Sequence, residues 1–155
     1  MALPVIAVGL LAGCGGDGGV PLYPASGQVL VNGQPAAGVE VRLHPADRPG
    51  DLDAPRPFAV TRENGSFELG TFAEGDGAPA GRYLVSLVWP EEPARREPPE
   101  DRLNWAYSDP HKSALRATIA EGETALEPFR VAFGEEPRVR ATTRPRNAGR
   151  PGPDG

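Results

Sequence analysis

The side chains that could do acid–base, metal or nucleophilic chemistry are two histidines, a few loop carboxylates and five serines. Zinc hydrolysis needs two histidines and a carboxylate at ligand spacing, together with a general base. His44 and His111 lie far apart in the sequence, and neither is followed by Glu three residues later. We therefore expect His44, which precedes Pro45, to be an edge or turn residue and His111 to be solvated.

Three carboxylates, Glu63, Glu74 and Asp76, fall near two expected turns. Oxygen ligands on loops are what calcium prefers, so these residues are weak metal candidates, although the chain has no Asp-x-Asp-x-Asp-Gly pattern and a solvated turn is the favoured interpretation. None of the serines lies in a Gly-x-Ser-x-Gly motif. The sequence thus predicts no catalytic residue and no cofactor, and we expect that the protein is not an enzyme.

Cys14, the single cysteine, follows an apolar run over residues 2–12. This run is too short to span a hydrocarbon core of about 30 Å, but its length is typical of a signal peptide. Leu11-Ala12-Gly13-Cys14 resembles the lipobox of bacterial lipoproteins. The resemblance implies a signal peptide over residues 1–13 and a Cys14 that carries two or three acyl chains, which suffice for stable anchoring. A buried strand or helix with a chance cysteine is the alternative.

The expected localisation is therefore the cell envelope, with a membrane-anchored lipoprotein that faces the periplasm or the exterior. The sequence does not indicate whether the anchor lies in the inner or the outer membrane. The glycine-rich stretch after Cys14 favours a flexible tether over residues 14–24. The formal net charge of −5 argues against nucleic acid as a partner. Residues 135–155 are rich in arginine and proline and nearly free of apolar side chains, which predicts a disordered tail.

The 20 glycines and 19 prolines separate short apolar runs, as turns do in an all-β protein. Seven runs qualify as strands, at residues 28–31, 39–43, 58–61, 66–69, 82–89, 115–119 and 129–133. Alternation within them predicts an inward-facing set: Val29, Val31, Val39, Val41, Leu43, Phe67, Leu69, Tyr83, Val85, Leu87, Ile119, Phe129, Val131 and Phe133. Asn32-Gly33 and Asn64-Gly65 mark tight turns. The pattern predicts an all-β fold, a single antiparallel sandwich of about seven strands.

Three stretches carry a resemblance to a known family. Residues 27–41, 61–69 and 81–85 resemble carboxypeptidase regulatory-like domains, and the likeness extends over residues 25–134. It implies a Greek-key sandwich of the transthyretin (prealbumin) type. More narrowly, residues 76–83 and 107–118 resemble small, mostly uncharacterised lipobox-bearing proteins of environmental bacteria. Because the shared glycines and aromatics serve turns and core, the resemblance speaks to fold and little to function.

Aromatic residues near the Pro-rich segment 90–110 are the remaining candidates for binding. Trp89 should close the core at a strand end, whereas Trp105 and Tyr107 either hold the long segment to the sandwich or stack on a ligand. We expect a non-catalytic accessory or protein-interaction module that displays an edge strand or the 90–114 loop to an envelope protein or a glycan. The alternative is a carbohydrate-binding module that uses Trp105 and Tyr107.

Overall fold

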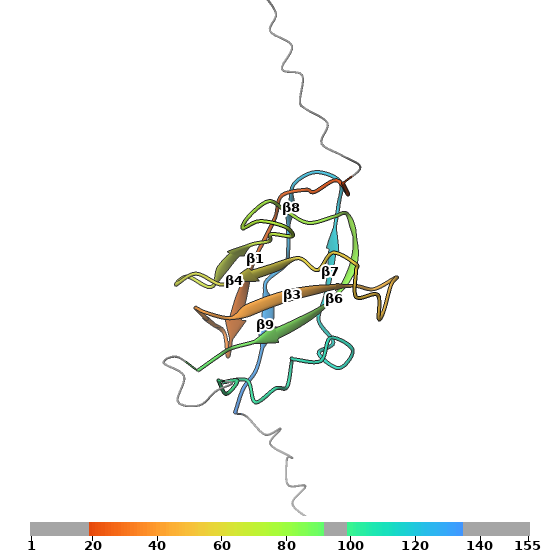
Figure 1. Cartoon of the computed structure of the whole chain (residues 1–155). Coiled ribbons are helices and arrows are strands. Elements are labelled where there is room, and N and C mark those ends of the chain that lie inside the picture. The colour runs from red at the N-terminus through yellow and green to blue at the C-terminus, as the bar shows by residue number, and fades with distance from the viewer. Residues whose placement is uncertain (1–18, 92–98, 135–155) are drawn as a thin grey trace, which may run out of the picture.

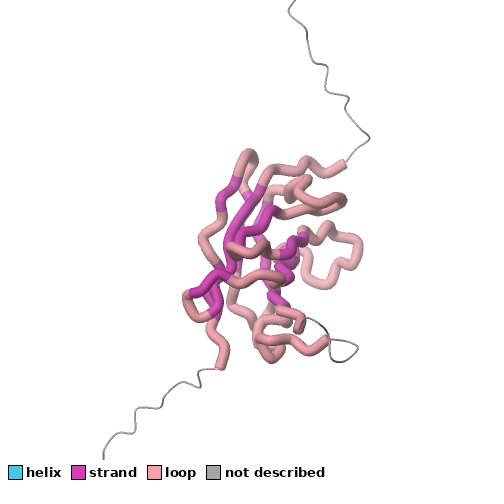
Figure 2. The backbone as a smooth tube through the Cα atoms, turned by 90° about the vertical axis from the view of Figure 1, so that its left-hand side faces the viewer, coloured by secondary structure: helices cyan, strands magenta, loops and turns pink. Residues whose placement is uncertain are grey.

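The protein folds into two β-sheets that pack face to face (Figure 1). The computed structural model describes residues 19–91 and 99–134, and within these ranges it contains strands, turns and loops but no helix (Figure 2). Its strands are β1 (Ala25–Val31), β2 (Gln34–Pro35), β3 (Glu40–Pro45), β4 (Phe58–Val60), β5 (Ser66–Glu68), β6 (Gly81–Val88), β7 (Arg116–Ile119), β8 (Thr124–Ala125) and β9 (Phe129–Val131). The expected all-β sandwich is confirmed, and each of the seven apolar runs contains a strand.

The longer strands hold the centre of each sheet. In one sheet β1 pairs with β2 and β5 antiparallel and with β8 and β9 parallel. The other sheet has the order β4-β3-β6-β7, and all of its pairs are antiparallel. The two parallel pairings differ from the purely antiparallel sandwich that we expected, because alternation of apolar residues indicates a strand but not its direction.

The core lies between the sheets and is formed by the residues that alternation turns inward. Thirteen of the fourteen expected inward residues are buried, and Phe133 is the exception with 44% of its surface exposed. The prediction for Phe133 was wrong because β9 ends at Val131. Beyond that point the Asn32 side chain, rather than a strand, bonds the Phe133 backbone: Phe133 N donates to Asn32 Oδ1 and Asn32 Nδ2 donates to Phe133 O.

An aromatic pair gives Gly27 a structural role. The Phe67 ring stacks on Phe129 with centroids 6.0 Å apart. It also lies directly over Gly27, where an added Cβ would come within 2.5 Å of the Phe67 ring. Only glycine at this position of β1 therefore leaves space for the ring.

The sandwich begins before the expected boundary at residue 25. Tyr23 pairs with Ala78 through two backbone hydrogen bonds of 2.9 Å, and Thr124 N donates to Pro24 O. The last residues of the expected tether 14–24 are therefore held against the fold. The described chain starts at one end of the sandwich and residue 134 leaves at the other, so the two ends face opposite directions (Figure 1).

Candidate functional site

Cys14, the expected lipidation site, lies outside the described residues, as do the signal peptide 1–13 and the tail 135–155. In the part of the chain that the structure describes, no helix has the length and apolarity needed to cross a membrane. The other candidate residues all have a defined place in the fold.

Asp101 organises the turn that carries Trp105. Its Oδ1 accepts the N–H of Trp89 at 2.7 Å and of Leu103 at 3.0 Å, and its Oδ2 accepts the N–H of Trp105 at 2.9 Å. Asp101 is buried, and so is Leu103 beneath it. Trp105 itself is 52% exposed and has a φ of 59°. This left-handed conformation is uncommon for a bulky residue.

The other two aromatic candidates are engaged within the fold. Trp89 follows β6, packs against the core and donates from Nε1 to Ala37 O at 2.9 Å, while Arg102 covers its ring at 5.0 Å. Tyr107 packs on the core as well. Its hydroxyl donates to Ala132 O and accepts from Ala132 N, each at 3.2 Å. Tyr107 therefore holds the long segment to the sandwich, and of the three aromatics only Trp105 presents an exposed ring.

The three carboxylate candidates do not converge. Asp76 accepts the N–H of Thr71 at 2.6 Å, Ala73 at 2.9 Å and Phe72 at 3.1 Å, whereas Glu63 and Glu74 lie on exposed turns. Desolvation would raise the pKa of Asp76, but these backbone donors, together with the N–H of Asp76 itself, outweigh it and the pKa lies below its usual value. Asp76 thus closes the 71–76 loop, and the described residues hold no cluster of three His, Cys, Asp or Glu suited to a metal ion.

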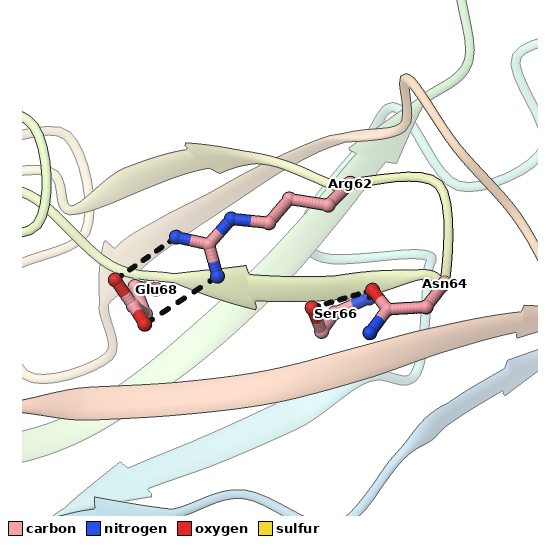
Figure 3. A network of polar contacts seen from close by, with 4 residues as sticks. All are labelled: Arg62, Asn64, Ser66 and Glu68. Carbon is pink, nitrogen blue, oxygen red and sulfur yellow. Dashed lines mark hydrogen bonds and ion pairs between the residues drawn. The ribbon is translucent and has the colours of Figure 1, made fainter.

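An exposed ion pair bridges the neighbouring β4–β5 hairpin. Arg62 donates to both carboxylate oxygens of Glu68, at 3.0 and 3.4 Å, while Asn64 Oδ1 accepts from the N–H and hydroxyl of Ser66 in the turn (Figure 3). The hydrogen bond and charge of Arg62 lower the pKa of Glu68. Both side chains of the pair are 57% exposed. Because water and salt screen such exposed charges, the pair contributes little to stability.

His44 and His111 line one pocket, a convergence that the sequence did not show. The pocket has a volume of about 170 Å³ and includes Arg48, Asp51 and Arg56 from the β3–β4 connection; we call it the basic pocket. His44 lies within β3, opposite Leu84, and so is not the edge or turn residue that we expected. Its Nε2 shares a hydrogen bond of 2.9 Å with Ser86 Oγ on β6.

The His44–Ser86 pair does not make a catalytic triad. Ser86 is only 7% exposed, and no carboxylate in the described ranges hydrogen-bonds the second ring nitrogen of His44. A serine nucleophile requires access to its substrate and a base that a third group orients.

A second hollow, of about 420 Å³, lies where edge strands of the two sheets come together. β7 ends one sheet, and β9 pairs with β1 alone among the described strands of the other. The hollow is lined by Arg116 and Thr118 of β7 and by Glu127, Pro128 and Arg130 near β9. We call this side of the sandwich the open edge.

Backbone groups on both walls of the open edge point away from their own sheets. Val85 N donates to Leu115 O, so alternation directs the N–H and C=O of Ala117 toward β6 and those of Arg116 and Thr118 outward. Asn32 N donates to Val131 O, so the neighbouring Arg130 turns its backbone away from β1. Within the described residues these outward groups have no strand partner.

The fold defines this protein as a two-sheet β-sandwich. No known family model matches the chain, and no curated protein matches it either. Among solved structures it is similar to a DUF3823 family protein from Parabacteroides merdae, with a TM-score of 0.40 and 15% sequence identity. The likeness covers 73% of this chain and 47% of that protein, so the chain spans about half of its length.

Proposed function

We propose that this protein is a lipid-anchored, non-catalytic accessory module of the cell envelope that binds an extended, acidic segment of another envelope protein at its open edge. One observation carries the proposal: β7 and β9 each leave backbone N–H and C=O groups unpaired, within the described residues, toward the same hollow. An added strand satisfies such groups, and this is how extended peptides join exposed sheet edges.

Charge favours an acidic segment. Arg116 and Arg130 flank the hollow, and Glu127 is the acidic side chain in its lining. Guanidinium groups pair well with carboxylates, so acidic side chains on the added strand would meet both arginines. Charged side chains and proline also discourage strands from pairing indiscriminately at an edge. The same residues would therefore select one partner and exclude copies of this chain.

The anchor rests on Leu11-Ala12-Gly13-Cys14. Intact mass measurement of the protein from bacterial membranes tests it directly. We expect a mature chain that starts at Cys14 with two or three acyl chains, and Cys14→Ala should abolish the added mass. A mature chain that begins at any other residue without lipid would overturn the anchor.

The resemblance to carboxypeptidase regulatory-like domains belongs to this proposal as well. Two close approaches support it. Gly27 leaves space for the Phe67 ring, and a Cβ added at Gly65 would lie 2.7 Å from Val29 O. Both glycines lie in the stretches that carry the resemblance, and at both positions close packing leaves no space for a larger side chain.

Site-specific photo-crosslinking in living cells tests the binding edge. A photoreactive residue in place of Thr118 or Arg130 should yield one discrete adduct with an envelope protein. The same residue in place of Leu52, which is 81% exposed in the β3–β4 connection, should yield none and serves as the matched control. Equal adducts at all three positions, or adducts at Leu52 alone, would overturn the proposal, as would the absence of adducts at both edge positions in anchored protein.

The carbohydrate-binding alternative retains one favourable observation, the exposed Trp105 ring held in a left-handed conformation. Such backbone strain at an exposed aromatic is found where a side chain is presented to a ligand. Tyr107 is not part of this alternative site, because its hydroxyl bonds Ala132 and its ring packs against the core. A glycan array probed with the full chain and with Trp105→Ala distinguishes the two: binding that Trp105→Ala abolishes would favour this alternative, and an empty array would exclude it.

A further inference from the structure

We propose that the basic pocket is a binding site for a small oxyanion of the phosphate type, separate from the open edge. The proposal does not depend on the identity of the partner at that edge. It rests on which side chains the fold brings to one small cavity and on how their charges balance.

Three parts of the chain form the walls. β3 supplies His44, the β3–β4 connection supplies Arg48, Asp51 and Arg56, and the segment before β7 supplies His111. The β3–β4 connection and the segment before β7 come together on the same side of the molecule (Figure 1). Five lining side chains that can ionise are thus drawn from positions as far apart as 44 and 111.

Positive charge predominates in this cavity. Its lining contains two arginines against the single carboxylate of Asp51, and the two histidines add ring nitrogens that can bond a ligand. That carboxylate is only loosely paired, with Arg48 Nη1 at 3.9 Å from Oδ2. Arg56 Nη2 donates to the backbone oxygen of Asp51 at 3.1 Å, a contact that orients the guanidinium without neutralising it.

The geometry also holds the donors in place. The His44 ring is fixed by its bond to the buried Ser86, and Arg56 is fixed by its bond to the Asp51 backbone. A guanidinium has five N–H donors, so one bond to the backbone leaves Arg56 the capacity to hold an oxyanion. Donors fixed before the ligand arrives bind it with less loss of side-chain entropy.

The electrostatics of His44 favour a negatively charged ligand. Burial is the main cause that lowers the pKa of His44, and the positive charges of Arg56, Arg42 and His111 lower it further. Asp51, the acidic side chain in the lining, is not among the causes that offset them. A bound anion would add a negative charge beside the ring and raise the pKa of His44.

The size of the cavity limits the ligand. Its volume is about 170 Å³. A water molecule occupies roughly 30 Å³ in the liquid, and pockets for larger organic ligands have volumes of roughly 300 Å³ or more. A phosphate group fits between these limits, whether free or as the end of a phosphomonoester. A phosphate group has at least three strong acceptor oxygens in a tetrahedral arrangement and a charge of about −1.5 to −2 near neutral pH, so it can meet donors from several walls, whereas a carboxylate offers two oxygens in one plane and a single charge.

The test is an NMR titration of the full chain that follows the imidazole resonances of His44 and His111. Sodium phosphate is added at pH 7 against sodium chloride at equal ionic strength, with methyl phosphate and acetate as further ligands. We expect saturable shifts of both histidines with phosphate, weaker binding of acetate and none with chloride. Saturation by methyl phosphate as well would assign the pocket to a phosphomonoester, and failure of methyl phosphate would assign it to the free ion.

Two substitutions in the pocket should change affinity in opposite directions. Arg56→Gln should weaken phosphate binding about tenfold or more, since it removes a charge-assisted donor. Asp51→Asn should tighten binding several-fold, since it removes the repelling carboxylate while an oxygen remains to accept the Asp53 N–H. Arg62→Gln, on the exposed hairpin, is the matched control and should leave the affinity unchanged.

The gain expected of Asp51→Asn cannot result from misfolding, which keeps the proposal testable if Arg56→Gln unfolds the chain. Shifts that rise linearly without saturation, or that chloride reproduces, would overturn the proposal. Equal affinities of the Asp51→Asn variant and the unmodified chain would also overturn it.

Discussion

The carboxylate of Asp101 accepts the backbone N–H of Trp105 at 2.9 Å and so holds an exposed tryptophan in left-handed backbone. Burial cannot explain this arrangement, because half of the Trp105 surface faces solvent. The strain belongs to the turn, and Asp101 is the residue that maintains it through three N–H donors.

Removal of the Asp101 carboxylate should destabilise the fold. We expect Asp101→Ala to lower the free energy of unfolding by about 3 kcal/mol, since it leaves three backbone donors without their acceptor, part of them buried. Denaturant unfolding measures the loss, with Glu121→Ala on an exposed turn as the control. A loss below about 1 kcal/mol would mean that water replaces Asp101 readily.

Trp105 should contribute little to stability, because half of its surface is exposed and its backbone is left-handed. Left-handed strain costs about 1–3 kcal/mol for a residue other than glycine, and Trp105→Gly relieves it. We therefore expect Trp105→Gly to leave the free energy of unfolding unchanged or higher.

Trp89 is the matched comparison, because its ring packs on the core and its N–H bonds Ala37 O. Loss of a packed aromatic ring is costly, so Trp89→Ala should lower the free energy of unfolding by about 3 kcal/mol. Denaturant unfolding of both variants makes the comparison. Destabilisation by Trp105→Gly as large as that of Trp89→Ala would refute this division of roles.

Two turn glycines with similar backbone conformations should respond differently to alanine. Gly33 has a φ of 80° and open space where a Cβ would project, whereas Gly65 has a φ of 74° and a Cβ would lie 2.7 Å from Val29 O. Both substitutions incur about 1–2 kcal/mol of left-handed strain, and Gly65→Ala adds a backbone clash. Gly65→Ala should therefore be the more destabilising in thermal unfolding. Equal losses would contradict the close packing at Gly65.

Acid should weaken the fold through His44. Its pKa in the folded protein lies below the ordinary value of 6.5, so the unfolded chain takes up the proton first as the pH falls. Stability is thus retained above pH 6.5 and declines as the pH falls from there through the folded pKa. NMR titration should show the low pKa of His44, and Arg56→Gln should raise it. An unchanged pKa in Arg56→Gln would contradict the electrostatic contribution of Arg56.

Alternation along the chain was enough to predict the strands and most of the core, because one face of each strand must be apolar. It failed at Phe133, where Asn32 replaces the strand partner, and it could not give the parallel direction of β9 beside β1. The alternation of apolar residues depends on which face of a strand is buried, and this is the same for parallel and antiparallel neighbours.

The basic pocket was beyond sequence-based prediction for a different reason. His44 and His111 come together only because the β3–β4 connection and the segment before β7 fold onto the same part of the β3–β6 sheet. The roles of Asp101 and Leu103 within the Pro-rich segment were not predicted, although an aspartate at a turn is a recognisable signal for a side chain that bonds the backbone two residues further on, as Asp101 does with Leu103. The sequence left open whether Trp105 and Tyr107 hold the long segment to the sandwich or face a ligand. The contacts in the structure decide this: the Tyr107 hydroxyl bonds Ala132, whereas the Trp105 ring is exposed.

Hydrogen–deuterium exchange of the lipidated protein, in its native membranes and after purification, tests the central claim most directly. A partner strand at the open edge should slow exchange of the outward amides of Thr118 and Arg130 in membranes, while Ala117, already bonded to β6, changes little. The segment 99–108 should exchange alike in both states. Two results would contradict the claim that this edge binds a partner: slower exchange in membranes that is confined to residues 99–108, or exchange of Thr118 and Arg130 that is the same in membranes and after purification.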